Sequence, residues 1–293
     1  MSSNPSLPTT IANYQLVEEI GRGAFGVVWL SRSKKTSQVY AIKILDKQEL
    51  ISPKQKESIE SEIKIMKKLR KKPFVLQFHE TFANSRYVFI VIEYAEMGDL
   101  YNLLVKNGKL SKDQVGYYII QISAGLNELH QSKIIYRDLK PSNVLLTHEG
   151  HVKLADFGLS KEVSSFDDDK TGSLCGTIVY LAPEVIRGED YSFSIDWYSL
   201  GILTHELYFN TIPIANGDPP ENSHELMKLI MNGDLTLDPD LEPEGQSFIY
   251  WLTDFNPKRR PKDFNHIKLH PWLSNLPWRK ILLNQSDYEG GWC

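Results

Sequence analysis

The hydrophobic pattern changes near residues 97–99, and this change limits the fold more than any other feature. Before it, strand-like runs rich in β-branched and aromatic residues fill residues 14–45, 73–82 and 86–94. Beyond it, apolar residues recur at helical spacing, as along residues 115–129. We therefore expect an α+β fold with a small antiparallel β-rich part and a larger, mainly helical part.

One key helix is expected within the first part. Ser52 and Pro53 are typical of a helix cap and a first turn. One helical face then carries Ile59, Ile63, Met66 and Leu69. In the second part, Ser111 and Gln114 fit a capping box at the start of a long helix.

Composition excludes several classes of protein. The 293 residues allow about two domains, and 41% hydrophobic with 24% charged residues is ordinary globular usage. Two cysteines, Cys175 and Cys293, exclude a disulfide scaffold and are typical of a reducing compartment. With a net charge of −4 and no signal peptide, long apolar run or lipidation motif, we expect no nucleic-acid or membrane partner. A cytoplasmic location is expected, with the nucleus also possible.

A glycine-rich loop joins the first two strand-like runs. It fits G-x-G-x-x-G and consists of Gly21, Arg22, Gly23, Ala24, Phe25 and Gly26. Asp46 lies where a dinucleotide-binding fold has its ribose-binding acid, but that fold needs a helix directly after the third glycine. Residues 27–30 are strand-like instead. The loop is therefore better interpreted as a flap whose backbone amides cover a triphosphate.

Lys43 lies inside the third apolar run. Burying a lysine is costly unless its charge is paired. Glu62 lies on the following helix and could turn toward the sheet. A Lys43–Glu62 pair would leave ammonium protons for phosphate oxygens, whereas an edge-strand lysine reaching solvent is the alternative.

Residues 136–143 and 155–158 contain the groups needed for phosphoryl transfer to a hydroxyl. Asp138 could accept the hydroxyl proton, and Lys140 could steady the transferred group. Asn143 and Asp156 offer oxygen ligands suited to Mg²⁺. Two acids, an amide and a lysine beside apolar strands are hard to explain by structure alone.

With these motifs in order, residues 14–283 resemble the eukaryotic protein kinases. The order continues with Ala182-Pro183-Glu184, with Asp196 at the helix that anchors the catalytic loop, and with Arg260 placed to pair with Glu184. The resemblance implies an N-lobe over residues 14–92, a hinge over 93–99 and a C-lobe over 100–283. Residues 1–13 would be a flexible tail and residues 284–293 a short one.

The resemblance also implies ATP and Mg²⁺ as cofactors, held at the hinge between the lobes. Glu93 and Ala95 would hydrogen-bond adenine, with Ile92 as gatekeeper. The side chains expected around the purine ring are Val28, Ala41 and Leu145, and Asp99 would meet ribose or substrate.

Two details are similar to the AGC group of serine/threonine kinases. Tyr136 stands before Arg137-Asp138, and Cys175-Gly176-Thr177 precedes the substrate-facing segment. By the resemblance, Thr177 contacts Asp138 and Lys140. Ser173 occupies the activation-loop phosphosite, where an upstream kinase would add a phosphate that meets Arg137 and Lys161.

Departures from the group shape the expected substrates and partners. Ser142 replaces a Glu that often reads a substrate arginine, but Asp99 and Glu206 remain. Residues 218–254 hold nine Asp/Glu and one Lys, so we expect protein substrates with basic residues upstream of the target. Few residues follow Trp278, and none forms a Phe-x-x-Phe motif. The groove beside the Glu62 helix could then be empty, or it could be filled by residues 278–293 or by a docking protein.

Two other functions stay open on the sequence. A pseudokinase scaffold is disfavoured because Lys43, Glu62, Asp138, Asn143 and Asp156 are all present. A small-molecule kinase is disfavoured by residues 175–177 and 182–184, which are typical of a platform for protein substrates.

Overall fold

The computed structural model describes residues 10–23, 26–163 and 175–283. It divides into two compact units. The first comprises Met1–Arg70 and Leu76–Ala95, and the second Lys71–Val75 and Glu96–Cys293. Residues 71–75 lie in the second unit, although they precede the expected hinge of residues 93–99.

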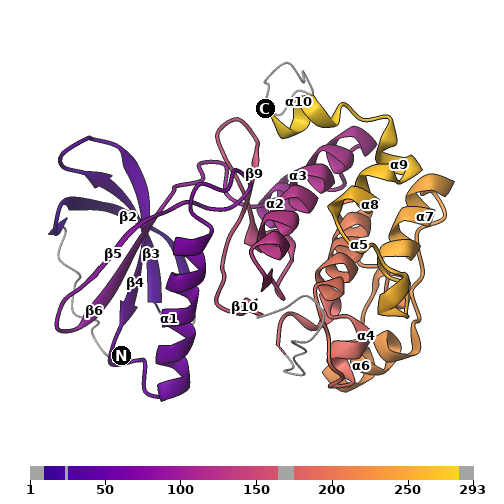
Figure 1. Ribbon diagram of the computed structural model, residues 1–293, viewed down its shortest axis with the longest axis horizontal. Coiled ribbons are helices and arrows are strands. Elements are labelled where there is room, and N and C mark those ends of the chain that lie inside the picture. Colours follow the sequence, from indigo (N-terminus) through magenta and orange to yellow (C-terminus); the bar gives the residue numbers. More distant parts are fainter. Residues whose placement is uncertain (1–9, 24–25, 164–174, 284–293) are drawn as a thin grey trace. The chain divides into compact units, whose positions relative to one another are not determined.

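The first unit is built on a six-stranded antiparallel sheet with the order β1-β2-β3-β4-β6-β5 (Figure 1). Its β-branched and aromatic runs form the strands because such side chains pack well on a pleated surface. The strands are β1 (Thr10–Ile11), β2 (Tyr14–Gly23), β3 (Gly26–Ser33), β4 (Val39–Asp46), β5 (Phe78–Ala83) and β6 (Tyr87–Ile92).

Each face of the sheet has its own contacts. Tyr14, Ile42 and Phe89 belong to an apolar cluster that covers one face. Ala41 and Lys43 alternate with Ile42 along β4, so they point to the opposite face. Helix α1 (Pro53–Lys68) reaches that opposite face through Glu62, which bonds Lys43.

The start of α1 follows the predicted chemistry. The Ser52 hydroxyl accepts a hydrogen bond from the Gln55 N–H at 3.2 Å, and the Gln55 side chain accepts one from the Ser52 N–H at 2.9 Å. Pro53 occupies the first turn, where a missing N–H costs nothing. The buried face of α1 carries Ile59, Glu62, Ile65 and Met66.

Two local predictions in this region were wrong. Residues 10 and 11 are not tail: they form β1 beside β2, and Ile11 is buried in the apolar cluster of the sheet. The strand predicted from residue 73 begins only at Phe78. The preceding residues bond to the second unit instead, since the Leu154 N–H donates to the Phe74 carbonyl at 2.9 Å.

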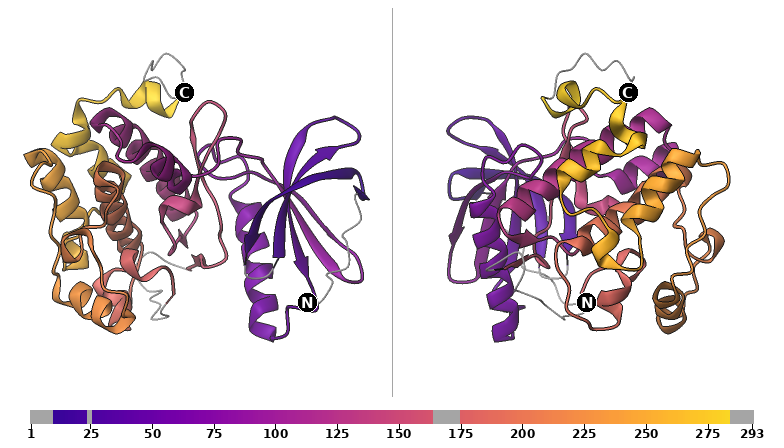
Figure 2. Two further views of the ribbon diagram at one scale, coloured as in Figure 1. Left: turned by 180° about the vertical axis from the view of Figure 1, so that it is seen from behind. Right: turned by 45° about the vertical axis from the view of Figure 1, so that its right-hand side comes forward.

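The second unit is mainly helical. Its long helices α3 and α5 lie side by side and are buried along most of their length (Figure 2). The helices are α2 (Leu100–Asn107), α3 (Lys112–Gln131), α4 (Pro183–Ile186), α5 (Ser194–Phe209), α6 (Ser223–Asn232), α7 (Pro243–Leu252), α8 (Phe264–Leu269), α9 (Pro271–Ser274) and α10 (Trp278–Leu282). The predicted capping box of Ser111 and Gln114 opens α3.

Two short ribbons complete this unit. They pair β7 (Ile134–Ile135) with β10 (Lys161–Glu162), and β8 (Val144–Leu146) with β9 (Val152–Leu154), both antiparallel. Four 3₁₀ turns lie at Pro141–Asn143, Ile178–Tyr180, Ala215–Gly217 and Pro257–Arg259.

Residues 72–75 are anchored within the second unit by several contacts. Lys72 forms an ion pair with Glu128 of α3 at 2.5 Å. The Phe74 side chain belongs to a buried cluster with Ala124 and Phe264, against which Trp278 and Leu282 of α10 pack. This segment is therefore part of the second unit's core rather than a surface loop.

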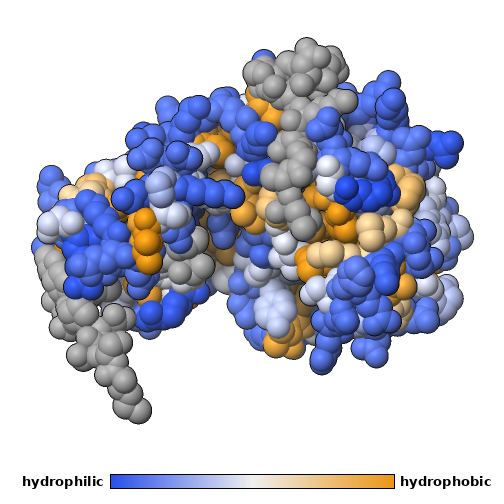
Figure 3. All heavy atoms as spheres, turned by 90° about the horizontal axis from the view of Figure 1, so that it is seen from below, coloured by the Kyte–Doolittle hydropathy of each residue, from blue (hydrophilic) through white to orange (hydrophobic). Residues whose placement is uncertain are grey.

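The face drawn in Figure 3 is mostly hydrophilic, with separate apolar patches. Exposed large apolar side chains include Ile51, Val105 and Leu269. Within the described ranges, no helix is both long enough and apolar enough to cross a bilayer.

Candidate active site

The glycine-rich segment joins two strands. Gly23 of β2 pairs with Gly26 of β3, so no helix follows the third glycine and the dinucleotide-binding alternative is excluded. Arg22 bonds Glu19 on the exposed edge of β2 at 2.8 Å. Ala24 and Phe25, also predicted to contact ATP, lie outside the described residues.

The three glycines differ in what their surroundings require. A Cβ on Gly26 would lie 2.0 Å from the Ile44 carbonyl oxygen, so packing against β4 excludes any side chain there. A Cβ on Gly21 would make only ordinary contact with Val28, and one on Gly23 would meet nothing within 4 Å. Packing therefore requires glycine at residue 26 but not at residues 21 and 23.

Lys43 and Glu62 form the contact that the sequence predicts. The Lys43 Nζ lies 2.6 Å from the Glu62 Oε1, and the two side chains are 27% and 7% exposed. Val28 pairs directly with Lys43 across the sheet, and Ala41 lies two residues before it, so all three share one face. The Lys43 side chain thus shares its face of the sheet with small apolar side chains.

The segment after β6 is attached to residue 77. The Glu93 N–H donates to the Gln77 carbonyl at 2.8 Å, and the Glu93 carboxylate accepts from the Gln77 N–H at 3.0 Å. These bonds set the backbone path toward Ala95, the last residue of the first unit.

In the second unit, four predicted residues meet around one carboxylate. Lys140 Nζ lies 2.9 Å from Asp138 Oδ2, and Asn143 Nδ2 donates to the same oxygen at 2.8 Å. Thr177 accepts from Lys140 at 3.0 Å and lies 3.4 Å from Asp138 Oδ1. Asp138 is 8% exposed, so these contacts fix its orientation.

The β8–β9 ribbon brings the two predicted metal ligands to one end. Val144 pairs with Leu154, and the Ala155 N–H donates to the Asn143 carbonyl at 3.0 Å. Asp156 follows directly, with an exposed side chain and a left-handed φ of 56°.

The donor set at this end suits Mg²⁺. The Asn143 amide nitrogen is engaged by Asp138, so the amide oxygen is its remaining ligand atom. No three His, Cys, Asp or Glu side chains converge on a metal position among the described residues. One carboxylate and one amide oxygen match Mg²⁺, which usually keeps water and phosphate ligands beside few protein groups.

Tyr136 links the Asp138 loop to the Asp156 segment. Its hydroxyl donates to the Ala155 carbonyl oxygen. The ring is fully buried, and burial raises the pKa of this phenol well above its usual value, with Asp156 and Asp138 adding to the shift. The hydroxyl therefore stays protonated and acts as a donor.

Asp196 of α5 holds the backbone of the same loop. Its carboxylate accepts from the Tyr136 and Arg137 N–H groups, each at 2.9 Å. His130 of α3 contacts it at 2.8 Å. The anchor was expected at Asp196, but His130 was missed because its spacing on α3 resembles that of an ordinary core residue.

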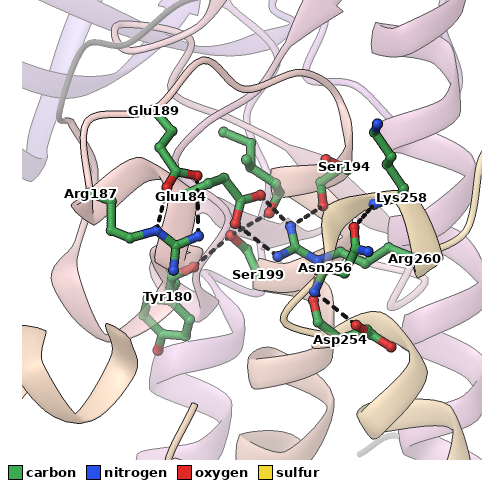
Figure 4. Close-up of polar contacts among 11 residues, drawn as sticks. Tyr180, Glu184, Arg187, Glu189, Ser194, Ser199, Asp254, Asn256, Lys258 and Arg260 are labelled. Atoms are coloured by element: carbon green, nitrogen blue, oxygen red, sulfur yellow. Dashed lines mark hydrogen bonds and ion pairs between the residues drawn. The ribbon is translucent and has the colours of Figure 1, made fainter. Parts of the chain in front are cut away.

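Glu184 and Arg260 form a buried pair (Figure 4). Arg260 also donates to the Asp254 carbonyl at 2.8 Å, and Ser199 donates to the Tyr180 carbonyl at 2.8 Å. The arginine thus joins α4 to the chain that leaves α7. Ser199 was not singled out in the sequence, where a lone helix serine carries no signal.

The predicted phosphate-binding residues lie close in the fold. Lys161 pairs with Ile135 across the β7–β10 ribbon, two residues from Arg137. Arg137 Nε donates to the Leu159 carbonyl at 2.5 Å, and Nη1 donates to the Tyr191 hydroxyl at 3.1 Å. Ser173 lies outside the described residues.

The remaining predicted residues have structural partners of their own. Asp99 caps α2 by accepting from the Asn102 N–H at 2.8 Å, and its backbone bridges to Leu145 of β8. Glu206 of α5 accepts from the Tyr180 hydroxyl at 2.6 Å. Burial raises the pKa of the Glu206 carboxyl.

Comparison with known proteins agrees with this geometry. The family model described as "Protein kinase domain" matches residues 14–273. The RAC family serine/threonine-protein kinase homolog of Dictyostelium discoideum is 36% identical over 271 residues, covering 92% of this chain and 60% of the relative. The cAMP-dependent protein kinase type 3 of Saccharomyces cerevisiae is 34% identical over 286 residues, covering 96% and 70%.

A third relative, the ribosomal protein S6 kinase 2 alpha of Gallus gallus, is 35% identical over 279 residues and 92% of this chain. The chain spans 36% of that relative's length, compared with 60% for the Dictyostelium discoideum relative. All three are AGC-type kinases, the group that the sequence motifs resemble.

Proposed function

Because this chain belongs to the protein kinase family, we propose that it transfers the γ-phosphoryl group of ATP to serine and threonine hydroxyls of proteins. The observation that carries the proposal is the cluster around Asp138. A buried carboxylate is held there by a lysine and an amide, with Thr177 beside it. Such a cluster suits chemistry at a hydroxyl.

Asp138 accepts the proton of the attacking hydroxyl in this proposal. Its Oδ2 is held by Lys140 and Asn143, so the carboxylate keeps its orientation as the substrate arrives. Lys140 also steadies the negative charge of the phosphoryl group in transit. Thr177 positions both side chains and favours an aliphatic hydroxyl as the acceptor.

Asn143 and Asp156 would hold Mg²⁺ through the amide oxygen and the carboxylate. When bound, the ion neutralises charge on the phosphate oxygens of ATP. The β8–β9 pairing and the Tyr136 hydroxyl keep these two ligands at one end of the ribbon.

ATP binding is proposed for residues of both units. In the first unit, Lys43 meets phosphate oxygens while paired with Glu62, and the loop of residues 21–26 covers the phosphates. The absence of any close contact for a Cβ at Gly21 or Gly23 supports this role, since packing does not explain glycine there. The adenine and ribose contacts are proposed for Val28, Ala41, Glu93, Ala95, Asp99 and Leu145.

Basic residues upstream of the target are the proposed substrate preference. Glu206 is a half-buried carboxylate that accepts from the neutral Tyr180 hydroxyl, so a substrate guanidinium would add an opposite charge. Asp99 is the second acidic residue, and its backbone bridges to Leu145. Its carboxylate also caps α2 by accepting from the Asn102 N–H. A peptide array without basic preference would refute this part.

Phosphorylation of Ser173 by an upstream kinase is proposed to raise activity. Lys161 pairs with Ile135, two residues before Arg137, and a phosphate that meets both basic groups would form about one to three charge-assisted hydrogen bonds. Ser173→Ala with unchanged kcat would contradict it. We also propose that a docking protein binds beside the Glu62 helix. The proposed location is the cytoplasm, with the nucleus also possible, and labelled protein found only in another compartment would contradict it.

The test measures transfer of labelled γ-phosphate from ATP to a library of basic peptides. Asp156→Ala serves as the control because the exposed Asp156 side chain has little part in packing. We expect strong transfer by the wild type and loss of roughly a thousandfold in the control. Equal signals from two folded proteins would favour a non-catalytic scaffold instead.

A further inference from the structure

Arg137 has an unusual backbone. Its φ is 71°, in the left-handed region that residues other than glycine, asparagine and aspartate seldom adopt. Such a conformation persists only when the surroundings hold it. Because Arg137 directly precedes Asp138, whatever holds residue 137 also aims the Asp138 carboxylate.

The backbone on both sides of Arg137 is crowded. Its N–H donates to Asp196, and a Cβ on Gly176 would lie 2.7 Å from its carbonyl oxygen. Gly176 itself has a φ of 106°, which favours glycine. The chain at residue 176 can pass close to residue 137 only because residue 176 lacks a side chain.

The guanidinium group is held from two different segments. On one side the Leu159 carbonyl accepts from Nε at 2.5 Å, three residues beyond Asp156. On the other, the Tyr191 hydroxyl accepts from Nη1 at 3.1 Å. Both of these acceptors are neutral groups of the protein.

Tyr191 is a rigid support for that bond. It is 3% exposed and lies in the buried cluster that also contains Ala182, Val185 and Ile195. These residues belong to α4, α5 and the segment before them, which also carry Glu184 and Asp196. A ring fixed on these elements can hold a side chain of the catalytic loop in a constant place.

We propose that Tyr191 is a positioning residue for the catalytic loop: its hydroxyl holds the Arg137 guanidinium and so keeps residue 137 in the conformation that aims Asp138. The support matters most when residue 173 carries no phosphate, since a phosphate would offer Arg137 a stronger acceptor. The inference rests on the proposed kinase function and deepens it by giving the loop a phosphate-independent support.

The test uses the full chain with Ser173→Ala, so that residue 173 cannot be phosphorylated. In this background we expect Tyr191→Phe to lower kcat about tenfold while the KM for ATP changes less than about twofold. Arg137→Gln should lower kcat similarly, and adding Tyr191→Phe to it should cause little further loss. An equal, additional loss in the double variant would overturn the proposal.

Tyr208→Phe is the matched control. It also removes a hydroxyl of the second unit, one that donates to Glu242 at 3.1 Å and accepts from the Trp272 ring N–H at 3.2 Å. Its kcat should equal that of the parent. A tenfold loss in this variant as well would show that any buried tyrosine hydroxyl has the same effect, which would also overturn the proposal.

Amide hydrogen exchange separates this inference from the proposed function. The Tyr136 and Arg137 N–H groups bond Asp196, and we expect Tyr191→Phe to speed their exchange without changing that of α7. An inactive wild type, together with faster exchange in the variant, would contradict the kinase function alone. Unchanged exchange would overturn the positioning role whatever the activity. If Tyr191→Phe does not fold, Arg137→Lys replaces it and should show the same changes.

Discussion

Arg260 holds Glu184 through two parallel hydrogen bonds in the interior of the second unit, Nη1 to Oε1 at 2.5 Å and Nη2 to Oε2 at 2.9 Å. The two side chains are 0% and 2% exposed. Removing one partner would leave the other charge buried and unpaired. The pair therefore joins α4 to the end of α7, and breaking it should strongly lower the free energy of unfolding.

Arg260→Met should lower the free energy of unfolding by about 3–5 kcal/mol, because Glu184 is left without its partner. Denaturant unfolding followed by circular dichroism measures this. Glu189→Gln is the control, since it breaks the exposed Arg187–Glu189 pair of Figure 4 and should change the free energy of unfolding far less. Equal losses in both variants would mean that the buried pair has no special role.

Gly26→Ala should lower stability, whereas Gly23→Ala should weaken ATP binding. A Cβ at residue 26 meets the Ile44 carbonyl, so Gly26→Ala should lower the thermal unfolding midpoint by several degrees. A Cβ at residue 23 has open space, so Gly23→Ala should keep that midpoint and raise the KM for ATP several-fold. Thermal unfolding and steady-state kinetics on both variants check this. The reverse pattern would refute the distinction between the glycines.

Substrate binding should depend on pH through Glu206. Burial raises the pKa of this carboxyl, so it is neutralised at a higher pH than an exposed glutamate as the solution is acidified. The KM for an arginine-containing peptide should therefore rise, roughly tenfold at full protonation, as pH falls toward 5. Glu206→Gln should show the high KM at every pH. A profile unchanged by this substitution would exclude Glu206 from substrate binding.

Stability should fall on acidification through His205. Its Nδ1 lies 2.8 Å from the Thr211 carbonyl and its Nε2 accepts from the Asp238 N–H at 3.1 Å, an arrangement that needs the neutral ring. Burial lowers the pKa of His205, although the Thr211 bond and Asp238 oppose this. A lowered pKa gives stability that is present above the usual value of 6.5 and is lost as pH falls.

Thermal unfolding between pH 7.5 and 5.5 tests this effect. The wild type should lose up to about 1.4 kcal/mol per pH unit more than His205→Gln, which cannot take up a proton. His148→Gln is the control because His148 is exposed. Equal pH slopes for wild type and His205→Gln would refute the role of His205.

Local patterns in the sequence predicted much of this fold. Ser52, Pro53 and Ser111 open helices as expected, because capping depends on neighbouring residues alone. The Lys43–Glu62 contact was also predictable, because a lysine in an apolar strand needs a partner. The roles of the site residues stay predictions that the kinetic tests address.

Other features depend on distant residues and could not be predicted locally. Residues 74 and 75 resemble a strand, but Phe74 packs beside Ala124 and bonds Leu154, which are separated from it by dozens of residues. Ile11 lies in a sequence that resembles a flexible tail, yet residues 10 and 11 pair with β2 as strand β1. Tyr191 stands in a polar stretch where nothing in the sequence connects it to Arg137.

The anchoring of residues 72–75 means that the chain passes between the two units three times, after Arg70, Val75 and Ala95. A chimaera with a relative joined at residue 96 would therefore exchange Phe74 and Lys72 along with the donor's sheet. Those side chains would meet Ala124, Phe264 and Glu128 of the recipient. A chimaera that exchanges the first unit should therefore take residues 71–75 from the same protein that supplies α3, α8 and α10.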